Sequence, residues 1–143
     1  MKIIIINGPN LNLLGMREQS NYGILTLLEI NKIIESEYKE IYFEFFQSNY
    51  EGEIIEIIQK AQKIFDALII NPGGFAHTSI AIKDALEDCK LIKIEVHLSH
   101  LAKREDYRQT LLTAINCDGY ISGFKEKGYL AAVYLAQKLY ECM

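Results

Sequence analysis

Short apolar runs recur along this chain and alternate with longer amphipathic stretches. The runs are rich in Ile, Phe and Tyr, and they are nearly continuous in apolarity, as is typical of parallel strands that are covered on both faces. The pattern predicts five strands, at Lys2–Ile6, Ile41–Phe46, Ala67–Ile70, Leu91–Val96 and Tyr120–Ile121.

Helical spacing characterises the segments between these runs. Thr26 followed by Glu29 is a capping-box sequence, in which each side chain satisfies a backbone N–H of the other residue. A further helix is predicted to begin at Thr78 or Ser79, because either hydroxyl can cap it, and a last one to span Tyr129–Glu141. Apolar residues recur at helical spacing in two stripes, Leu27, Ile30, Ile34 and Tyr38, and then Ile54, Ile57, Ile58, Ala61 and Phe65.

The alternation of strands and helices predicts an α/β fold, a doubly wound five-stranded parallel sheet with helices on both faces. Right-handed crossovers leave few topologies, and we predict the flavodoxin-like strand order 2-1-3-4-5 in a single domain over residues 1–143. Ligands bind such sheets at the carboxyl ends of the strands, where the strand order reverses. The loops at that point begin at Asn7 and Asn71, and both are polar and rich in Gly.

Composition narrows the class of protein. The chain has 143 residues, a formal net charge of −4 and no basic cluster, so nucleic-acid binding is disfavoured. Its N-terminus does not resemble a signal peptide, and no apolar stretch approaches the roughly 20 residues that span a bilayer. Cys89, Cys117 and Cys142 show no metal-binding spacing, so we expect reduced thiols in a cytoplasmic protein.

Four predicted loops gather polar residues at the carboxyl edge. They are Asn7–Tyr22, Gln47–Glu53, Asn71–His77 and His97–Arg108, and all three histidines, His77, His97 and His100, lie in two of them. The first loop is long and is expected to lack secondary structure, which is uncommon unless a loop is functional or disordered. A metal site is not expected, because two neighbouring histidines have no convincing third ligand.

Arg17 and Tyr22 are the residue types that a basic phenolate needs, a tyrosine and a cation that stabilises its ionised form. A free phenol has a pKa near 10, so a general base would need a shift of about three units. One guanidinium at about 4 Å, at an effective dielectric constant of about 20, supplies roughly 4 kcal/mol, which is about that shift. The alternative is that Tyr22 only packs and Arg17 is solvated.

Glu95 and His97 lie two residues apart, and hence on one face of a strand end. A carboxylate beside an imidazole fixes its tautomer and raises its basicity, which suits a general acid. The alternative is an ion pair that only stabilises the strand end.

The Asn71-Pro72-Gly73-Gly74 sequence predicts a tight turn that leads into a helix N-terminus. Its exposed N–H groups suit an anionic or hydroxylated ligand, although a plain turn explains the sequence equally well. His77 could bind either that ligand or the backbone.

Several of these segments occur together, in the same order, in a known family. The chain resembles type II 3-dehydroquinate dehydratases along nearly its whole length. The stretches that carry the resemblance are NGPNLNLLGMRE, Tyr22-Gly23, FFQSNYEGEII, INPGGFAHTSIAIKDAL, IEVHLSH with Arg108 downstream, and GYISGFKEKGYLAAVYLA.

The resemblance implies a flavodoxin-like fold and the reversible elimination of water from 3-dehydroquinate through an enolate, in the shikimate pathway to aromatic amino acids. Tyr22 would be the base, and Arg17 would keep it anionic. Asn10 would lie near the enolate oxygen, with a water molecule between the two, and His97 would protonate the leaving hydroxyl with Glu95 orienting it.

The resemblance also implies the remaining contacts. The substrate would be held by Asn71, His77, Leu98, Ser99 and Arg108. Asp84 would reach the site of a neighbouring subunit, since the family forms trimers grouped into dodecamers. No cofactor, metal or Schiff-base lysine would take part. The chain departs from the family after Ser99, in His100–Arg104, and at Leu111.

Two other functions fit a fold of this class. A flavodoxin-like binding module for a nucleotide or flavin rests on fold analogy alone. The second is a catalytically silent oligomeric protein that keeps Asp84 for subunit contacts.

Overall fold

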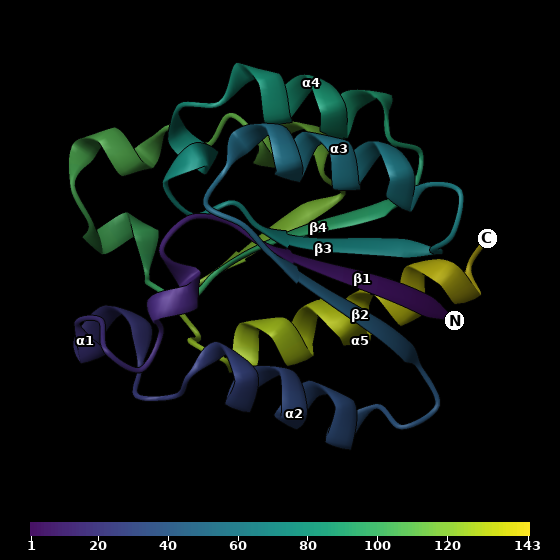
Figure 1. Ribbon diagram of the computed structural model, residues 1–143, viewed down its shortest axis with the longest axis horizontal. Coiled ribbons are helices and arrows are strands. Elements are labelled where there is room, and N and C mark those ends of the chain that lie inside the picture. The colour runs from purple at the N-terminus through teal and green to yellow at the C-terminus, as the bar shows by residue number, and fades with distance from the viewer.

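The five strands form one parallel sheet in the order β2-β1-β3-β4-β5. A computed structural model describes all residues, 1–143, and Figure 1 shows the sheet between two layers of helices. The predicted fold class and strand order are therefore confirmed. The strands are β1 (Lys2–Asn7), β2 (Tyr42–Gln47), β3 (Ala67–Asn71), β4 (Ile92–His97) and β5 (Gly119–Ser122).

Helices cover both faces of the sheet (Figure 1). One face carries α2 (Leu27–Glu37) and α5 (Lys127–Glu141), and the other carries α3 (Glu51–Ala61) and α4 (Ile80–Asp88). No helix is long and apolar enough to cross a membrane.

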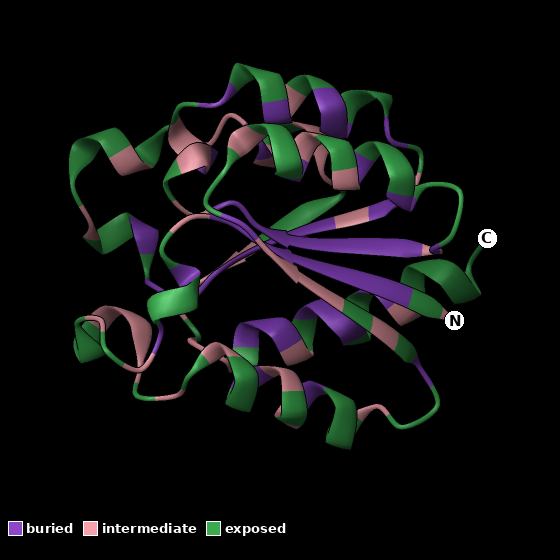
Figure 2. Cartoon of the chain, viewed as in Figure 1, coloured by how far each residue is buried: buried purple, intermediate pink, exposed green.

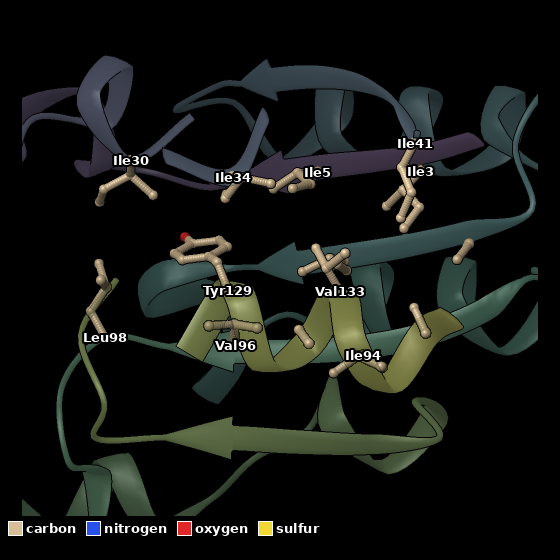
Figure 3. Packing of buried hydrophobic residues seen from close by; sticks show 14 of the residues in the cluster. Ile3, Ile5, Ile30, Ile34, Ile41, Ile94, Val96, Leu98, Tyr129 and Val133 are labelled. Atoms are coloured by element: carbon tan, nitrogen blue, oxygen red, sulfur yellow. The ribbon is translucent and has the colours of Figure 1, made fainter. Parts of the chain in front are cut away.

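Alternation along the central strand divides the core in two. Ile3 and Ile5 of β1 face α2 and α5, whereas Ile4 and Ile6 face α3 and α4, and all four are fully buried. Figure 2 shows β1, β3 and β4 as largely buried strands. The nearly continuous apolarity of these strands thus reflects burial on both faces. In Figure 3, Tyr129 projects from α5 into the first of these two cores.

The helix boundaries follow local capping chemistry. The Thr26–Glu29 capping box forms, with reciprocal hydrogen bonds of 3.2 and 2.8 Å between side chain and backbone. Of the two hydroxyls predicted to cap α4, it is Ser79 that accepts from the N–H of Ile82. Phe65 lies beyond the end of α3 but remains buried.

The predicted Asn7–Tyr22 loop is not free of secondary structure, so that prediction was wrong. It contains a 3₁₀ turn at Leu11–Leu13 and a short helix, α1 (Gln19–Tyr22). Glu18 explains the helix, because its carboxylate accepts from the N–H groups of Ser20 and Asn21 and so replaces the missing helical partners. Tyr22 therefore lies in the last turn of α1.

Candidate active site

One polar pocket opens at the carboxyl edge of the sheet. All of the predicted site residues line it except Glu95 and Asp84. The complete lining is Pro9, Asn10, Leu11, Arg17, Tyr22, Asn71, Gly73, Gly74, His77, His97, Leu98, Ser99, Leu101, Arg104 and Arg108. The segments that meet here follow β1, β3 and β4, in agreement with the expected switch point between β1 and β3.

Tyr22 lies between two guanidinium groups. The Cζ atom of Arg17 is 3.8 Å from the centre of the phenol ring. Arg104 donates from Nη1 to the Tyr22 hydroxyl at 3.2 Å and to Ser99 Oγ at 3.0 Å. Burial opposes the charge of Arg104, but its contacts with Tyr22 and Glu105 outweigh that effect, so its pKa is raised. One cation therefore lies over the phenol ring, and the other contacts the hydroxyl at which a phenolate would form.

Sequence reasoning missed Arg104. It lies in the predicted His97–Arg108 loop, where Arg108 was the only arginine given a role. An arginine in a loop at the carboxyl edge is a weak signal by itself. The contact with Tyr22 spans 82 residues of sequence, so spacing along the chain does not reveal it.

His97 and Glu95 form the predicted pair at the end of β4. His97 Nε2 lies 2.6 Å from Glu95 Oε1, and Glu95 is fully buried behind the pocket wall. The second carboxylate oxygen, Oε2, accepts from the Thr113 hydroxyl at 2.5 Å. Because Nε2 is engaged with Glu95, the other ring nitrogen of His97, Nδ1, is the one available to a ligand in the pocket.

His77 contacts both the pocket and the backbone. Its Nδ1 lies 2.8 Å from the carbonyl oxygen of Thr110, and its ring is stacked on that of His97 with 6.2 Å between centroids. The position of His77 is thus compatible with both predicted roles, a contact with a ligand and a contact with the backbone. The third histidine, His100, does not line the pocket. It packs instead against Gly123, where a side chain would collide with the His100 ring.

We expect His77 to titrate below its ordinary pKa of 6.5, because burial disfavours the imidazolium. The unfolded chain then binds the proton more readily than the folded one. The free energy of unfolding should consequently fall as the pH drops from about 6.5 through the lower pKa of the folded state. An NMR titration of the His77 ring measures this directly, and a midpoint above 6.5 would contradict it.

The amide of Asn71 is held by the fold. Its Oδ1 accepts from the N–H of Gly73 at 3.1 Å, and its Nδ2 donates to the Tyr129 hydroxyl at 3.1 Å. That hydroxyl donates in turn to Asn7 Oδ1 at 2.5 Å. Burial raises the pKa of Tyr129, which keeps the hydroxyl protonated as a donor. One N–H of the Asn71 amide remains available to a ligand.

Tyr129→Phe should lower the free energy of unfolding by roughly 1–3 kcal/mol, because buried Asn7 and Asn71 each lose a partner. The ring itself stays in place, so the apolar packing is retained. Urea denaturation measures the loss. Tyr134→Phe on the exposed side of α5 is the matched control, and an equal loss in both variants would contradict the account.

Glu105 organises the two arginines that follow β4. Its Oε2 accepts from Arg108 Nε at 2.9 Å and from Arg104 Nε at 3.2 Å. The backbone N–H of Glu105 and these neighbouring cations hold its pKa at about 2. The terminal guanidinium nitrogens of Arg108 are left for a ligand.

Asp84 has no place in this pocket. It lies exposed on α4, and its one ion pair is with Lys83, at an Oδ1–Nζ distance of 3.7 Å. No group of three or more His, Cys, Asp or Glu side chains is placed to hold a metal ion.

The parallel α/β sheet brings a tyrosine beside two arginines and a buried histidine–glutamate pair together at its carboxyl edge, an arrangement that suits acid–base chemistry. A family model described as class II dehydroquinase matches residues 1–137. The chain belongs to this family of lyases.

Similar proteins cover almost the whole chain. A 3-dehydroquinate dehydratase from Fusobacterium nucleatum is 48% identical over 96% of this chain and 97% of that relative. One from Clostridium perfringens is 50% identical over 96% and 97%. The crystal structure of a type II dehydroquinase from Butyrivibrio crossotus superposes with a TM-score of 0.93 at 42% identity, covering 96% of this chain and 97% of that one.

Proposed function

We propose that this protein is a 3-dehydroquinate dehydratase, which eliminates water from 3-dehydroquinate to give 3-dehydroshikimate in the shikimate pathway. The observation that carries the mechanism is the position of Tyr22, between Arg17 and Arg104 and in the same pocket as His97. A base and an acid of different chemical type suit a stepwise elimination through an enolate.

Tyr22 is the proposed base. As a phenolate it removes the proton α to the ketone, and the guanidinium groups of Arg17 and Arg104 stabilise the negative charge. Each cation at about 4 Å is worth roughly 4 kcal/mol to the anion at an effective dielectric constant of about 20. The two arginines come from different segments of the chain, so the favourable field depends on the contact of Tyr22 with the loop that follows β4.

The enolate that results needs its own stabilisation. We assign this role to Asn10, acting through a water molecule, together with Arg17. Asn10 lines the pocket. It has a left-handed backbone, with φ of 68°, and immediately precedes the 3₁₀ turn. Donors that are already in place when charge develops lower the barrier without a cost of reorganisation.

His97 is the proposed acid. Its Nδ1 protonates the leaving hydroxyl, and Glu95 stabilises the imidazolium from the opposite side of the ring at 2.6 Å. The complete burial of Glu95 strengthens this interaction, because little solvent screens it.

The remaining pocket residues are proposed to hold the substrate. Arg108 suits its carboxylate, because a guanidinium can bind a carboxylate with two parallel hydrogen bonds. Asn71, His77 and the backbone N–H groups of Leu98 and Ser99 would bind the ring hydroxyls. Neither of these two N–H groups has a backbone partner in the protein.

Asp84 is proposed to act in an oligomer. Its exposure on α4, outside the pocket of its own chain, fits a contact with the site of a neighbouring subunit in a trimer or dodecamer. Sedimentation velocity of wild-type protein and the Asp84→Ala variant tests the assembly, and a monomeric wild type would contradict it.

The absorbance of the conjugated enone tests the proposed function. Purified protein should produce a rise in absorbance with 3-dehydroquinate, and the rise should survive treatment with borohydride, which would trap an imine. A flat trace from folded protein would contradict the proposal, and binding of flavin or nucleotide would then favour the binding-module alternative.

A further inference from the structure

Glu95 has a second partner that the proposed chemistry does not use. While Oε1 faces His97, Oε2 accepts a hydrogen bond of 2.5 Å from the hydroxyl of Thr113. Thr113, like Glu95, is fully buried. Both oxygens of the Glu95 carboxylate are therefore engaged, one with His97, which lines the pocket, and the other with Thr113, which does not.

The local geometry of Thr113 shows that its hydroxyl is committed to Glu95. Thr113 precedes the 3₁₀ turn Ala114–Asn116, at the position where a threonine ordinarily accepts a hydrogen bond from a backbone N–H. No such capping bond forms here. The hydroxyl instead donates to a carboxylate 18 residues away in sequence.

The segment that carries Thr113 is fixed against the other histidine as well. The N–H of Leu112 donates to the carbonyl of Ala76 at 2.8 Å, and the carbonyl of Thr110 meets His77 Nδ1 at 2.8 Å. Residues 110–113 are thus hydrogen-bonded to the segment that carries Ala76 and His77. These bonds limit the movement of the Thr113 hydroxyl relative to Glu95.

We propose that Thr113 is a positioning residue for the acid of the reaction. Its hydrogen bond fixes the rotation of the Glu95 carboxylate, and Glu95 in turn fixes the ring of His97 with Nδ1 toward the substrate. This inference rests on the proposed function of His97. A carboxylate left with one unsatisfied buried oxygen can rotate, and the imidazole then loses its fixed tautomer.

Thr113→Val removes the hydroxyl and keeps the shape of the side chain, whereas Thr113→Ser keeps the donor. In Thr113→Val, kcat for 3-dehydroquinate should fall about tenfold, the equivalent of one lost hydrogen bond to a charged group, with KM changed by less than about twofold. Thr113→Ser should restore most of kcat. If the valine variant does not fold, Thr113→Ala provides the same comparison.

A readout that does not depend on turnover separates this inference from the proposed function. Long-range ¹H–¹⁵N spectra of the histidine rings should show one His97 tautomer in wild type and Thr113→Ser, and a mixture in Thr113→Val. Wild-type kcat and an unchanged His97 spectrum in Thr113→Val would overturn the inference. A folded wild type that does not convert 3-dehydroquinate would overturn the proposed function instead, and the spectra would still decide whether Thr113 positions His97.

Discussion

Replacing Tyr22 with Phe is expected to lower kcat by about 10⁴-fold, the upper end of the range for a general base. The substitution removes one oxygen atom and leaves the ring on which Arg17 packs. The substrate should still bind, because the proposed binding groups are untouched. Initial rates of enone formation over a range of substrate concentrations measure kcat and KM separately.

Tyr42→Phe is the matched control for this variant. Tyr42 is 57% exposed on β2 and does not line the pocket, so the same chemical change there should leave kcat unaltered. Near-normal turnover in Tyr22→Phe would exclude Tyr22 as the base. The cation-flanked phenol would then have only a binding role.

Replacing His97 with Asn is expected to lower kcat by about 10³-fold, within the range for a general acid. An amide can still donate to Glu95, so the buried carboxylate does not lose its partner, but it cannot protonate a leaving hydroxyl. Activity should remain above that of Tyr22→Phe, because water can replace an acid more readily than a positioned base.

His100→Asn is the matched control, since His100 is an exposed histidine outside the pocket. We expect its kcat to match that of wild type. Equal losses in His97→Asn and His100→Asn would point to a disturbed β4 loop in place of a missing acid.

The fold was predictable because its signals are local or periodic. The isoleucines of β1 alternate between two cores, and the Thr26–Glu29 capping box sets the start of α2 within a single turn. The short α1 was missed, because Glu18 caps it with a carboxylate that no apolar period reveals.

The candidate site was predictable only in part. Residues in sequence motifs, such as Tyr22 and His97, were found, and the structure brings them into one pocket. Arg104, Thr113 and Tyr129 were not, because their partners lie 82, 18 and 58 residues away in sequence. Hydrogen bonds of this kind depend on how the loops and α5 pack together, which the spacing of residues along the chain does not reveal.

The central claim is the division of labour between a tyrosine base and a histidine acid. It is tested most directly by incubating 3-dehydroquinate with each variant in D₂O and measuring deuterium at the carbon α to the ketone. His97→Asn should incorporate deuterium without eliminating water, because its base is intact, and Tyr22→Phe should incorporate none. Incorporation by Tyr22→Phe but not by His97→Asn would contradict the account.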